Sequence, residues 1–402
     1  MTSFWRLSGS CLRATKNPCK LMTYRIADFP FFRALFAFAS VDPKVPISFS
    51  TAQSRYFYEI FSATTDRTLY VRAVIYKGTG ASLDSRYSQV DVPAEQSRVF
   101  VPVGEEEGKR VSFSVMSTPI LSTLKRLEQL YTIAGGLSSL PNSVQVLFPT
   151  EAAGKALKLL LSAQAIRFNG RSTKETPWEE DNDQVDCNSD GSIACKSRIG
   201  LDEARGAQED VMATLNTTYY VPLCCDDALI ATSMAAASFV LHPSDEKVLI
   251  TLRVTFFHGM CNQILNSANS LTEYNLFLEF LKESVMNVPS YRIRLSATSD
   301  ISGIKAIAEL PSNLTTNTSG NVWLQWSQKS IWTPCAIQLG KLQLALLTKA
   351  LKLYVGTFGP DSQMTLIITK NYELVLRIPL NTAGGDRAAI FTFIAVCVGC
   401  DL

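Results

Sequence analysis

The chain contains little that a catalytic or cofactor site could use. Among its 402 residues are only two histidines, His242 before a proline and His258 before a glycine, both at the ends of expected strands. No glycine-rich phosphate loop with its lysine occurs. Cys397 and Cys400 have the spacing of metal ligands, but no second pair accompanies them. These absences predict a protein that is not an enzyme and that uses no cofactor and no metal.

Long hydrophobic runs are also missing. The longest late apolar run, residues 388–398, is far shorter than the roughly 20 residues that cross a bilayer. No secretory segment opens the chain, so the sequons at Asn216, Asn313 and Asn317 are expected to carry no glycan. The ten cysteines are scattered, several of them in apolar strands, which favours a reducing compartment. We expect a soluble protein without a membrane partner. A secreted or surface β-rich glycoprotein stays open as an alternative, because sequons are present and the cysteine count is even.

Negative charge is concentrated in one segment. The formal net charge is +2, but residues 175–210 hold eleven acidic and three basic residues, a net of −8, so the remainder carries +10. The segment also lacks the apolar residues that a core needs, which predicts a disordered insertion at about 172–212. A basic folded body suits a polyanionic partner, although ordinary solubility charge is the alternative.

The first 21 residues, by contrast, contain no Asp or Glu. Residues 1–21 are interpreted as an unstructured extension before a first strand at Met22, which could itself be the translation start. A mitochondrial transit peptide is the alternative.

The most regular pattern lies in the last third of the chain. Alternation at 335–339 predicts a strand, and three- and four-residue spacing at 341–354 predicts an amphipathic helix whose apolar stripe includes Leu342 and Leu353. No Asp or Glu occurs from 312 to 359. β-Branched and aromatic runs then predict an antiparallel meander. The polar side of the helix carries Lys341, Lys349 and Lys352.

An earlier stretch has the sequence pattern of the same unit, with its elements in the same order. Residues 144–148 predict a strand and 150–163 a helix, and the pentapeptide KALKL at Lys155–Leu159 recurs at Lys349–Leu353. Lys155 and Lys158 would share one face of this helix. Two lysine-bearing helices with few acids nearby are typical of a surface that faces phosphates. The alternative is that each lysine only solvates the outer side of its helix.

Other patterns complete the expected organisation. Helices are predicted at 29–40, which carries Arg33, at 118–131 and at 271–287, with strands at 238–241 and 247–257 and a short polar crossing at 261–270. The crossing is the predicted boundary between a first domain, 22–262, and a second, 270–402.

Five stretches together resemble the sliding clamps of the proliferating cell nuclear antigen superfamily, and more narrowly the Hus subunits of the nine-one-one DNA damage checkpoint clamp. They are VSFSVMSTPIL at 111–121, VQVLFPTEAAGKALKLL at 144–160, the stretch 271–303, AIQLGKLQLALL at 336–347 and YELVLRIPL at 372–380. The resemblance implies an α+β, two-domain sliding-clamp fold with antiparallel sheets outside and helices inside a ring.

The resemblance also implies a role. The chain would be a non-catalytic nuclear subunit of a heterotrimeric ring with two related clamp subunits, encircling double-stranded DNA without reading its sequence. A separate ATP-driven clamp loader would place it there, and it would support repair and checkpoint proteins. A replicative processivity clamp built as a homo-oligomer is the alternative. The DNA-facing residues would be Lys155, Lys158, Lys341, Lys349, Lys352 and Arg33.

Two features depart from the family pattern. The acidic insertion has no counterpart in the typical subunit. The helix expected at 271–287 carries Glu273, Glu279 and Glu283 beside a single lysine, Lys282, which makes it a poor surface for DNA.

Overall fold

The computed structural model describes most of the chain, in segments separated by gaps. The described residues are 22–26, 28–50, 57–76, 99–102, 112–133, 143–148, 156–166, 196–200, 212–239, 241–268, 273–285, 288–299, 301, 303, 305–311, 324–325, 331–360, 362–381 and 387–402. The expected extension at 1–21 lies outside them, as does most of the expected insertion.

In the described part of the first structural unit there are ten strands and two long helices. In chain order its elements are β1 (Met22–Ile26), α1 (Phe29–Ala39), β2 (Pro46–Ser50), β3 (Phe57–Ala63), β4 (Leu69–Tyr76), β5 (Phe100–Pro102), β6 (Ser112–Met116), α2 (Ser117–Ile133), β7 (Ser143–Phe148), β8 (Ala156–Ile166), β9 (Lys196–Gly200) and β10 (Met212–Pro222). A connector follows, with α3 (Asp227–Met234) and two short 3-10 turns, η2 (Ala235–Ser238) and η3 (Pro243–Asp245).

The second unit repeats this order. Its elements are β11 (Glu246–Arg253), α4 (Val254–Ala268), β12 (Asn275–Val285), β13 (Val288–Thr298), β14 (Lys305–Pro311), β15 (Leu324–Gln325), β16 (Ile331–Trp332), β17 (Cys335–Leu339), α5 (Lys341–Phe358), β18 (Gln363–Thr369), β19 (Leu374–Asn381), β20 (Arg387–Ala395) and β21 (Val398–Asp401).

Strand pairing shows that the two units share one topology. In the first, β1 pairs with β7, β7 with β8 and β8 with β10. In the second, β11 pairs with β18, β18 with β19 and β19 with β20. The remaining strands pair in the same way in both units. In the first unit β3 lies between β2 and β4, and β2 also pairs with β6. In the second unit β13 lies between β12 and β14, and β12 also pairs with β17. The duplication expected from the sequence is therefore present, with α5 corresponding to α2.

A single sheet joins the two units. Its path runs β15-β11-β18-β19-β20-β4-β3-β2-β6, and β20 of the second unit pairs antiparallel with β4 of the first, from Ala389↔Ile75 to Ala395↔Leu69. At the end of this joint, Gln343 donates from its Nε2 to the carbonyl oxygens of Thr68 and Val396, at 2.9 Å each. The first turn of α5 is thereby tied to both units.

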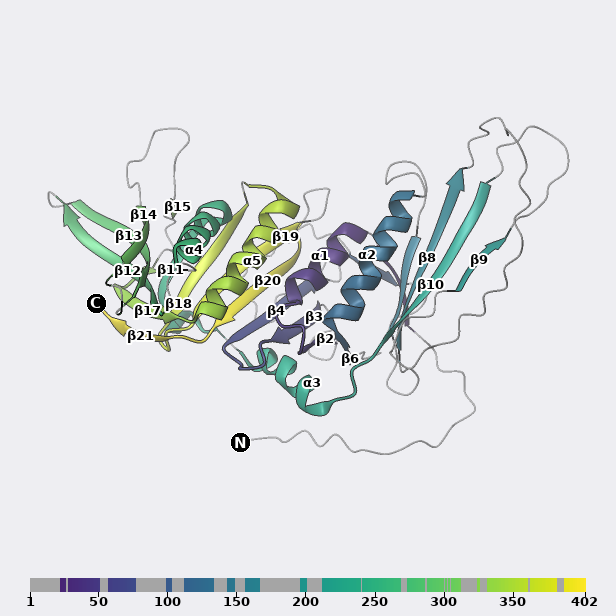
Figure 1. The fold of residues 1–402 in the computed structure, drawn as a ribbon, viewed down its shortest axis with the longest axis horizontal. Coiled ribbons are helices and arrows are strands. Elements are labelled where there is room, and N and C mark those ends of the chain that lie inside the picture. The colour runs from purple at the N-terminus through teal and green to yellow at the C-terminus, as the bar shows by residue number, and fades with distance from the viewer. Residues whose placement is uncertain are drawn as a thin grey trace.

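Four helices form a layer against the sheets. In Figure 1 α4, α5, α1 and α2 lie side by side in that order along the long axis. α1 and α5 contact each other through aromatic rings. The ring centres of Phe38 and Tyr354 are 6.0 Å apart, and those of Phe31 and Phe358 are 6.3 Å apart. α3 lies apart from this layer and contacts β2 and β3, where the buried hydroxyl of Ser233 meets that of Ser48. The α+β class, with antiparallel sheets on one side and helices on the other, is confirmed.

The sequence of α1 explains its start and its burial. The Asp28 side chain accepts a hydrogen bond from the Phe31 amide at 2.9 Å, and a proline occupies the first turn, where its missing N–H costs nothing. Phe29, Phe31, Phe32, Phe36 and Phe38 are all buried. The helix predicted at 29–40 is confirmed, as are those at 118–131 and 341–354.

The predicted helix at 150–163 is wrong. Residues 156–166 form β8, which is paired along one edge with β7 and along the other with β10. Ala, Leu and Lys favour helix in isolation, but β10 pairs with β8 along residues 156–166 and β7 pairs with it at residues 158–162, which supplies hydrogen-bond partners to its backbone in place of those within a helix. The KALKL pentapeptide therefore enters β8 in one unit and lies in α5 in the other, and it does not mark the repeat.

The predicted helix at 271–287 is also wrong, because residues 275–285 form β12 between β13 and β17. Leu276, Leu278 and Phe280 alternate into the core, a period of two that the dense apolar sequence hides. The strand predicted at 238–241 is wrong as well. Residue 238 is the last residue of the turn η2, and residues 239 and 241 belong to no strand.

The polar crossing expected at 261–270 is instead the second half of α4. This helix takes over at Val254, so the strand expected at 247–257 ends at Arg253. Its aromatic and β-branched first turn, VTFF, resembles a strand in sequence, yet Phe257, Met260, Cys261 and Ile264 are buried at helical spacing. The repeated topology of the second unit consequently begins at β11, and residues 262–268 lie within α4, whereas the domain bounds 22–262 and 270–402 stay a prediction. Within the expected insertion, β9 is a strand rather than disordered chain.

Candidate nucleic-acid interface

The exposed side of α5 carries lysines and no acid. Lys341, Lys349 and Lys352 are exposed, while Leu344, Leu347 and Leu351 on the opposite side are buried against the sheet. Leu342 and Leu353 were expected in the apolar stripe, but their exposed fractions of 54% and 38% place them beside the lysines. The helix therefore presents a surface in which positive charge alternates with apolar side chains.

The lysines of α5 differ in their surroundings. The Lys341 ammonium lies 5.1 Å from the centre of the Tyr274 ring, a cation–π contact near the start of the helix. Lys352 lies close enough to His258 on α4 to lower its pKa, after the larger effect of burial. Lys349 and Lys352 are one turn apart on the exposed side and are the best placed of the three to meet an anion.

The first unit adds positive charge to the same layer. Arg33 on α1 forms an ion pair with Glu128 on α2, and both side chains are partly exposed. Lys125 and Arg126 on α2 are exposed. The sequence analysis predicted α2 but did not single out these two residues, although adjacent bases on an amphipathic helix were a readable signal.

α4 contributes no charge of either sign. None of its residues from Val254 to Ala268 is Asp, Glu, Lys or Arg, and its exposed positions include Asn262, Gln263 and Asn266. The four helices of the layer together contain six basic residues and one acidic residue, a net of +5. A net positive charge, with amides that can donate and accept hydrogen bonds, suits a phosphate backbone.

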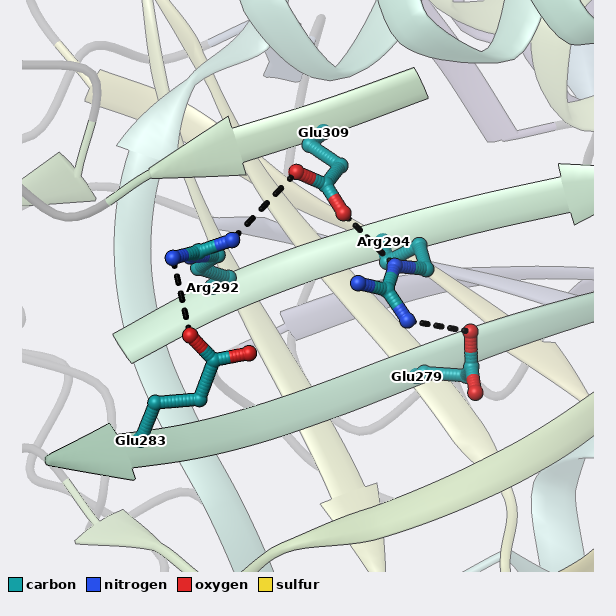
Figure 2. A network of polar contacts seen from close by, with 5 residues as sticks. All are labelled: Glu279, Glu283, Arg292, Arg294 and Glu309. Carbon is teal, nitrogen blue, oxygen red and sulfur yellow. Dashed lines mark hydrogen bonds and ion pairs between the residues drawn. The ribbon is translucent and has the colours of Figure 1, made fainter. Parts of the chain in front are cut away.

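Two of the three acids that were expected to weaken this surface, Glu279 and Glu283, lie on another face of the molecule. Glu279 and Glu283 are on β12, Arg292 and Arg294 on β13, and Glu309 on β14, and Figure 2 shows the five side chains meeting across the three strands. They occupy strand positions that alternate with the residues buried under α4, so they face away from the helix layer.

Each arginine of this network bridges two carboxylates. Arg292 lies 2.8 Å from Glu283 and 3.7 Å from Glu309, and Arg294 lies 2.6 Å from Glu309 and 3.8 Å from Glu279. The hydrogen bond to Glu309 is the main cause of the raised pKa of Arg294. Glu279 and Glu283 are thus paired with arginines within the sheet, which removes these two acids as a reason for doubting the helix surface of the second unit.

The described residues show no competing chemical site. They contain no group of three or more His, Cys, Asp or Glu that could hold a metal ion. The six described cysteines are unpaired, and burial raises the pKa of the Cys397 thiol to about 12, so this residue is a weak metal ligand at neutral pH. In the same described segments, no helix has the length and apolar character needed to cross a membrane.

Comparison with known proteins gives matches in structure only. No family model and no curated protein matches the sequence. Solved proliferating cell nuclear antigens have a similar fold. The proliferating cellular nuclear antigen of Entamoeba histolytica superposes with a TM-score of 0.48 at 9% identity, covering 94% of this chain and 98% of that one.

Two archaeal proteins give comparable values. A PCNA2–PCNA3 complex from Sulfolobus tokodaii has a TM-score of 0.46 at 11% identity, covering 94% of this chain and 99% of that one. The PCNA of Thermococcus kodakaraensis has a TM-score of 0.47 at 10% identity, covering 94% and 100%. Every score is below 0.5, so a functional assignment has to rest on the chain's own topology and charges.

The structure brings together some of the predicted site residues and separates others. Lys341, Lys349, Lys352 and Arg33 share the helix layer, although Arg33 is paired with Glu128. Lys158 is in β8, where it pairs with Tyr220 of β10, and not on a helix. Lys155 lies outside the described residues. Lys125 and Arg126 join the set in their place.

Proposed function

We propose that this chain is a non-catalytic subunit of a ring-shaped DNA clamp. The observation that carries the proposal is the helix layer, in which four helices from two equivalent units lie on one side of the sheets with a net charge of +5. Lysines and arginines on such a surface bind phosphates through charge, which holds duplex DNA without reading its sequence and lets the protein slide.

Ring formation follows from the way the two units join. Inside the chain, the last strand of one unit pairs with the fourth strand of the other, β20 with β4. The corresponding strands β10 and β14 lie at opposite ends of the molecule in Figure 1. Repeating the internal joint between subunits, β10 of one with β14 of the next, would place each helix layer on the inside of a closed ring and would cover the exposed edge of β14.

The resemblance to Hus subunits supports a narrower role within this proposal. The chain would assemble with two related clamp subunits into a heterotrimer in the nucleus, support DNA damage signalling and repair proteins, and depend on a separate clamp loader. A replicative clamp made of identical copies is the alternative. Light scattering on the purified chain and on the complex purified from cells separates the two, because only the replicative clamp is a ring of one chain.

Topological linkage to DNA is the decisive test. The tagged chain is purified from cells with its partners and loader, loaded onto nicked circular DNA, and washed at high salt. A closed clamp stays on the circle and slides off when the circle is linearised. Retention that is lost at high salt on circles and linear DNA alike would show ordinary electrostatic binding and would overturn the proposal.

A further inference from the structure

The sheet that joins the two units is made of two blocks. One block is β11-β18-β19-β20 from the second unit, and the other is β4-β3-β2-β6 from the first. They meet at seven consecutive residue pairs between β20 and β4, all antiparallel.

The equivalent blocks at the two ends of the molecule (Figure 1) belong to two different sheets and are not joined to each other. The block β1-β7-β8-β10 belongs to a six-stranded sheet, and the block β14-β13-β12-β17 belongs to a five-stranded sheet. Among the described residues β14 is the end strand of its sheet, with β13 on one side and no strand on the other. Its Ile307 has an exposed fraction of 45%.

The outer edge of β10 is already occupied. β9 pairs with it in antiparallel register from Thr218↔Lys196 to Thr214↔Gly200. The same edge of the equivalent strand, β20, pairs with β4. β9 therefore takes the position that the fourth strand of a unit takes at the internal joint, and for β10 that fourth strand would be β14 of another molecule.

We propose that β9 is a built-in strand that closes the β10 edge and keeps it from pairing with β14 of a second copy of this chain. The inference rests on the proposed ring function, because only a chain that joins end to end needs these two edges. It assigns a role to a strand for which the described residues show no equivalent between β19 and β20 in the second unit.

Physical competition favours the resident strand. β9 is tethered by the residues between 200 and 212, which gives it an effective concentration in the millimolar range, whereas a second copy arrives at micromolar concentration. β14 of a second copy could pair with β10 over a longer stretch than β9 does, because the internal joint spans seven residue pairs and β9 makes five. The edge is thus closed at rest and opens when β9 is released.

Paired proline substitutions test this directly. Successive residues of a strand point their N–H groups to opposite sides, so the double variant R198P/I199P removes a hydrogen bond to β10 whichever side each residue faces. The matched control R198T/I199T removes the same charge and the same apolar side chain but keeps strand-forming residues. Each protein is studied by sedimentation velocity over a micromolar concentration series, with circular dichroism to confirm that it is folded.

We expect the wild type and the threonine control to sediment as monomers and the proline variant to form oligomers. A synthetic peptide with the β14 sequence, residues 305–311, should dissociate those oligomers, whereas a scrambled peptide should not. A wild type that already self-associates, a folded proline variant that stays monomeric, or oligomers that ignore the peptide would each overturn the inference.

A second route avoids any folding defect of the proline variant. Protease sites are placed on both sides of β9, within 172–195 and 201–211, so that the chain folds with β9 present and loses it afterwards. Oligomers should appear after cleavage at both sites and not after cleavage at one. Absence of oligomers after complete removal of β9 would contradict the inference while leaving the test of linkage to circular DNA unaffected.

Discussion

Arg33 on α1 and Glu128 on α2 form an ion pair across the helix layer of the first unit. The exposed fractions of their side chains are 41% and 38%, so the pair contributes little to stability, about 0–1 kcal/mol. Its main consequence is electrostatic, because the single acid of the layer neutralises one of its six bases.

Replacing this acid should strengthen DNA binding. In E128Q the Arg33 guanidinium is released to meet phosphate, so affinity for a short duplex should rise and the slope of log affinity against log salt should steepen by about 0.9 if one more phosphate is contacted. Fluorescence anisotropy over a salt series measures both. R33Q should have the wild-type slope or a slightly smaller one, and an E128Q slope equal to that of the wild type would show that Arg33 does not reach DNA.

Reversing the two best-placed lysines should weaken DNA binding. K349E/K352E places two acids on the exposed side of α5, which should reduce the salt-dependent slope by about 2 and the affinity at low salt by at least tenfold. K305E/K370E changes the net charge by the same amount at two exposed lysines outside the helix layer, in β14 and in the turn between β18 and β19, and is the control for net charge. Similar losses in both proteins would point to overall charge and not to a surface on α5.

A buried ion pair should matter far more for stability than the exposed network. Glu59 on β3 and Arg72 on β4 lie 2.5 Å apart, with side-chain exposures of 1% and 13%, and Arg72 also donates to the Phe239 carbonyl oxygen at 3.3 Å. E59A leaves the guanidinium buried without its counter-ion, which should lower the free energy of unfolding by about 3–5 kcal/mol.

Glu309 is the matched control for this substitution. It lies in the partly exposed network of Figure 2, so E309A should cost about 1 kcal/mol or less. Urea unfolding followed by circular dichroism gives both values. An E59A cost no larger than that of E309A would mean that the first pair is hydrated.

His258 should make the fold sensitive to mild acid. Its Nε2 is buried without a hydrogen-bond partner among the described residues, and burial, followed by the charge of Lys352, lowers its pKa below the ordinary value of 6.5. Below pH 6.5, His258 therefore binds a proton in the unfolded chain but stays neutral in the folded chain. The free energy of unfolding consequently falls as the pH drops toward the lowered pKa.

Substitution should remove this dependence. H258L keeps an apolar side chain at the site and has no proton to bind, so its unfolding free energy should fall less between neutral and mildly acidic pH than that of the wild type. H242L, at the histidine in the connector, is the control. Parallel curves for H258L and the wild type would show that His258 is solvated enough to titrate normally.

The sequence determined much of the second unit. Gly340 before a lysine-rich helix, followed by three apolar runs separated by turn residues, predicts β17, α5 and the meander, because each signal is local. The phenylalanines behind Asp28 likewise predict α1. For this reason Lys341, Lys349, Lys352 and Arg33 were assigned to helices correctly.

The remaining site residues could not be placed from local pattern. Lys158 was assigned to a helix because its neighbours favour one, and Lys125 and Arg126 gained meaning only when α2 was seen beside α1. The acids at 279 and 283 were assigned to the helix layer because a dense apolar run hides its period; their strand faces the other way.

Composition and local periodicity alone determined the partition of charge, three of the four long helices, and the strands of the closing meander. Tertiary structure decided whether 156–166 and 275–285 are strands, because a strand is stabilised by hydrogen bonds to neighbours that are distant in the chain, such as β10 for β8. It also decided that the chain is a true repeat, since equivalence lies in which strands pair and not in the letters that two segments share.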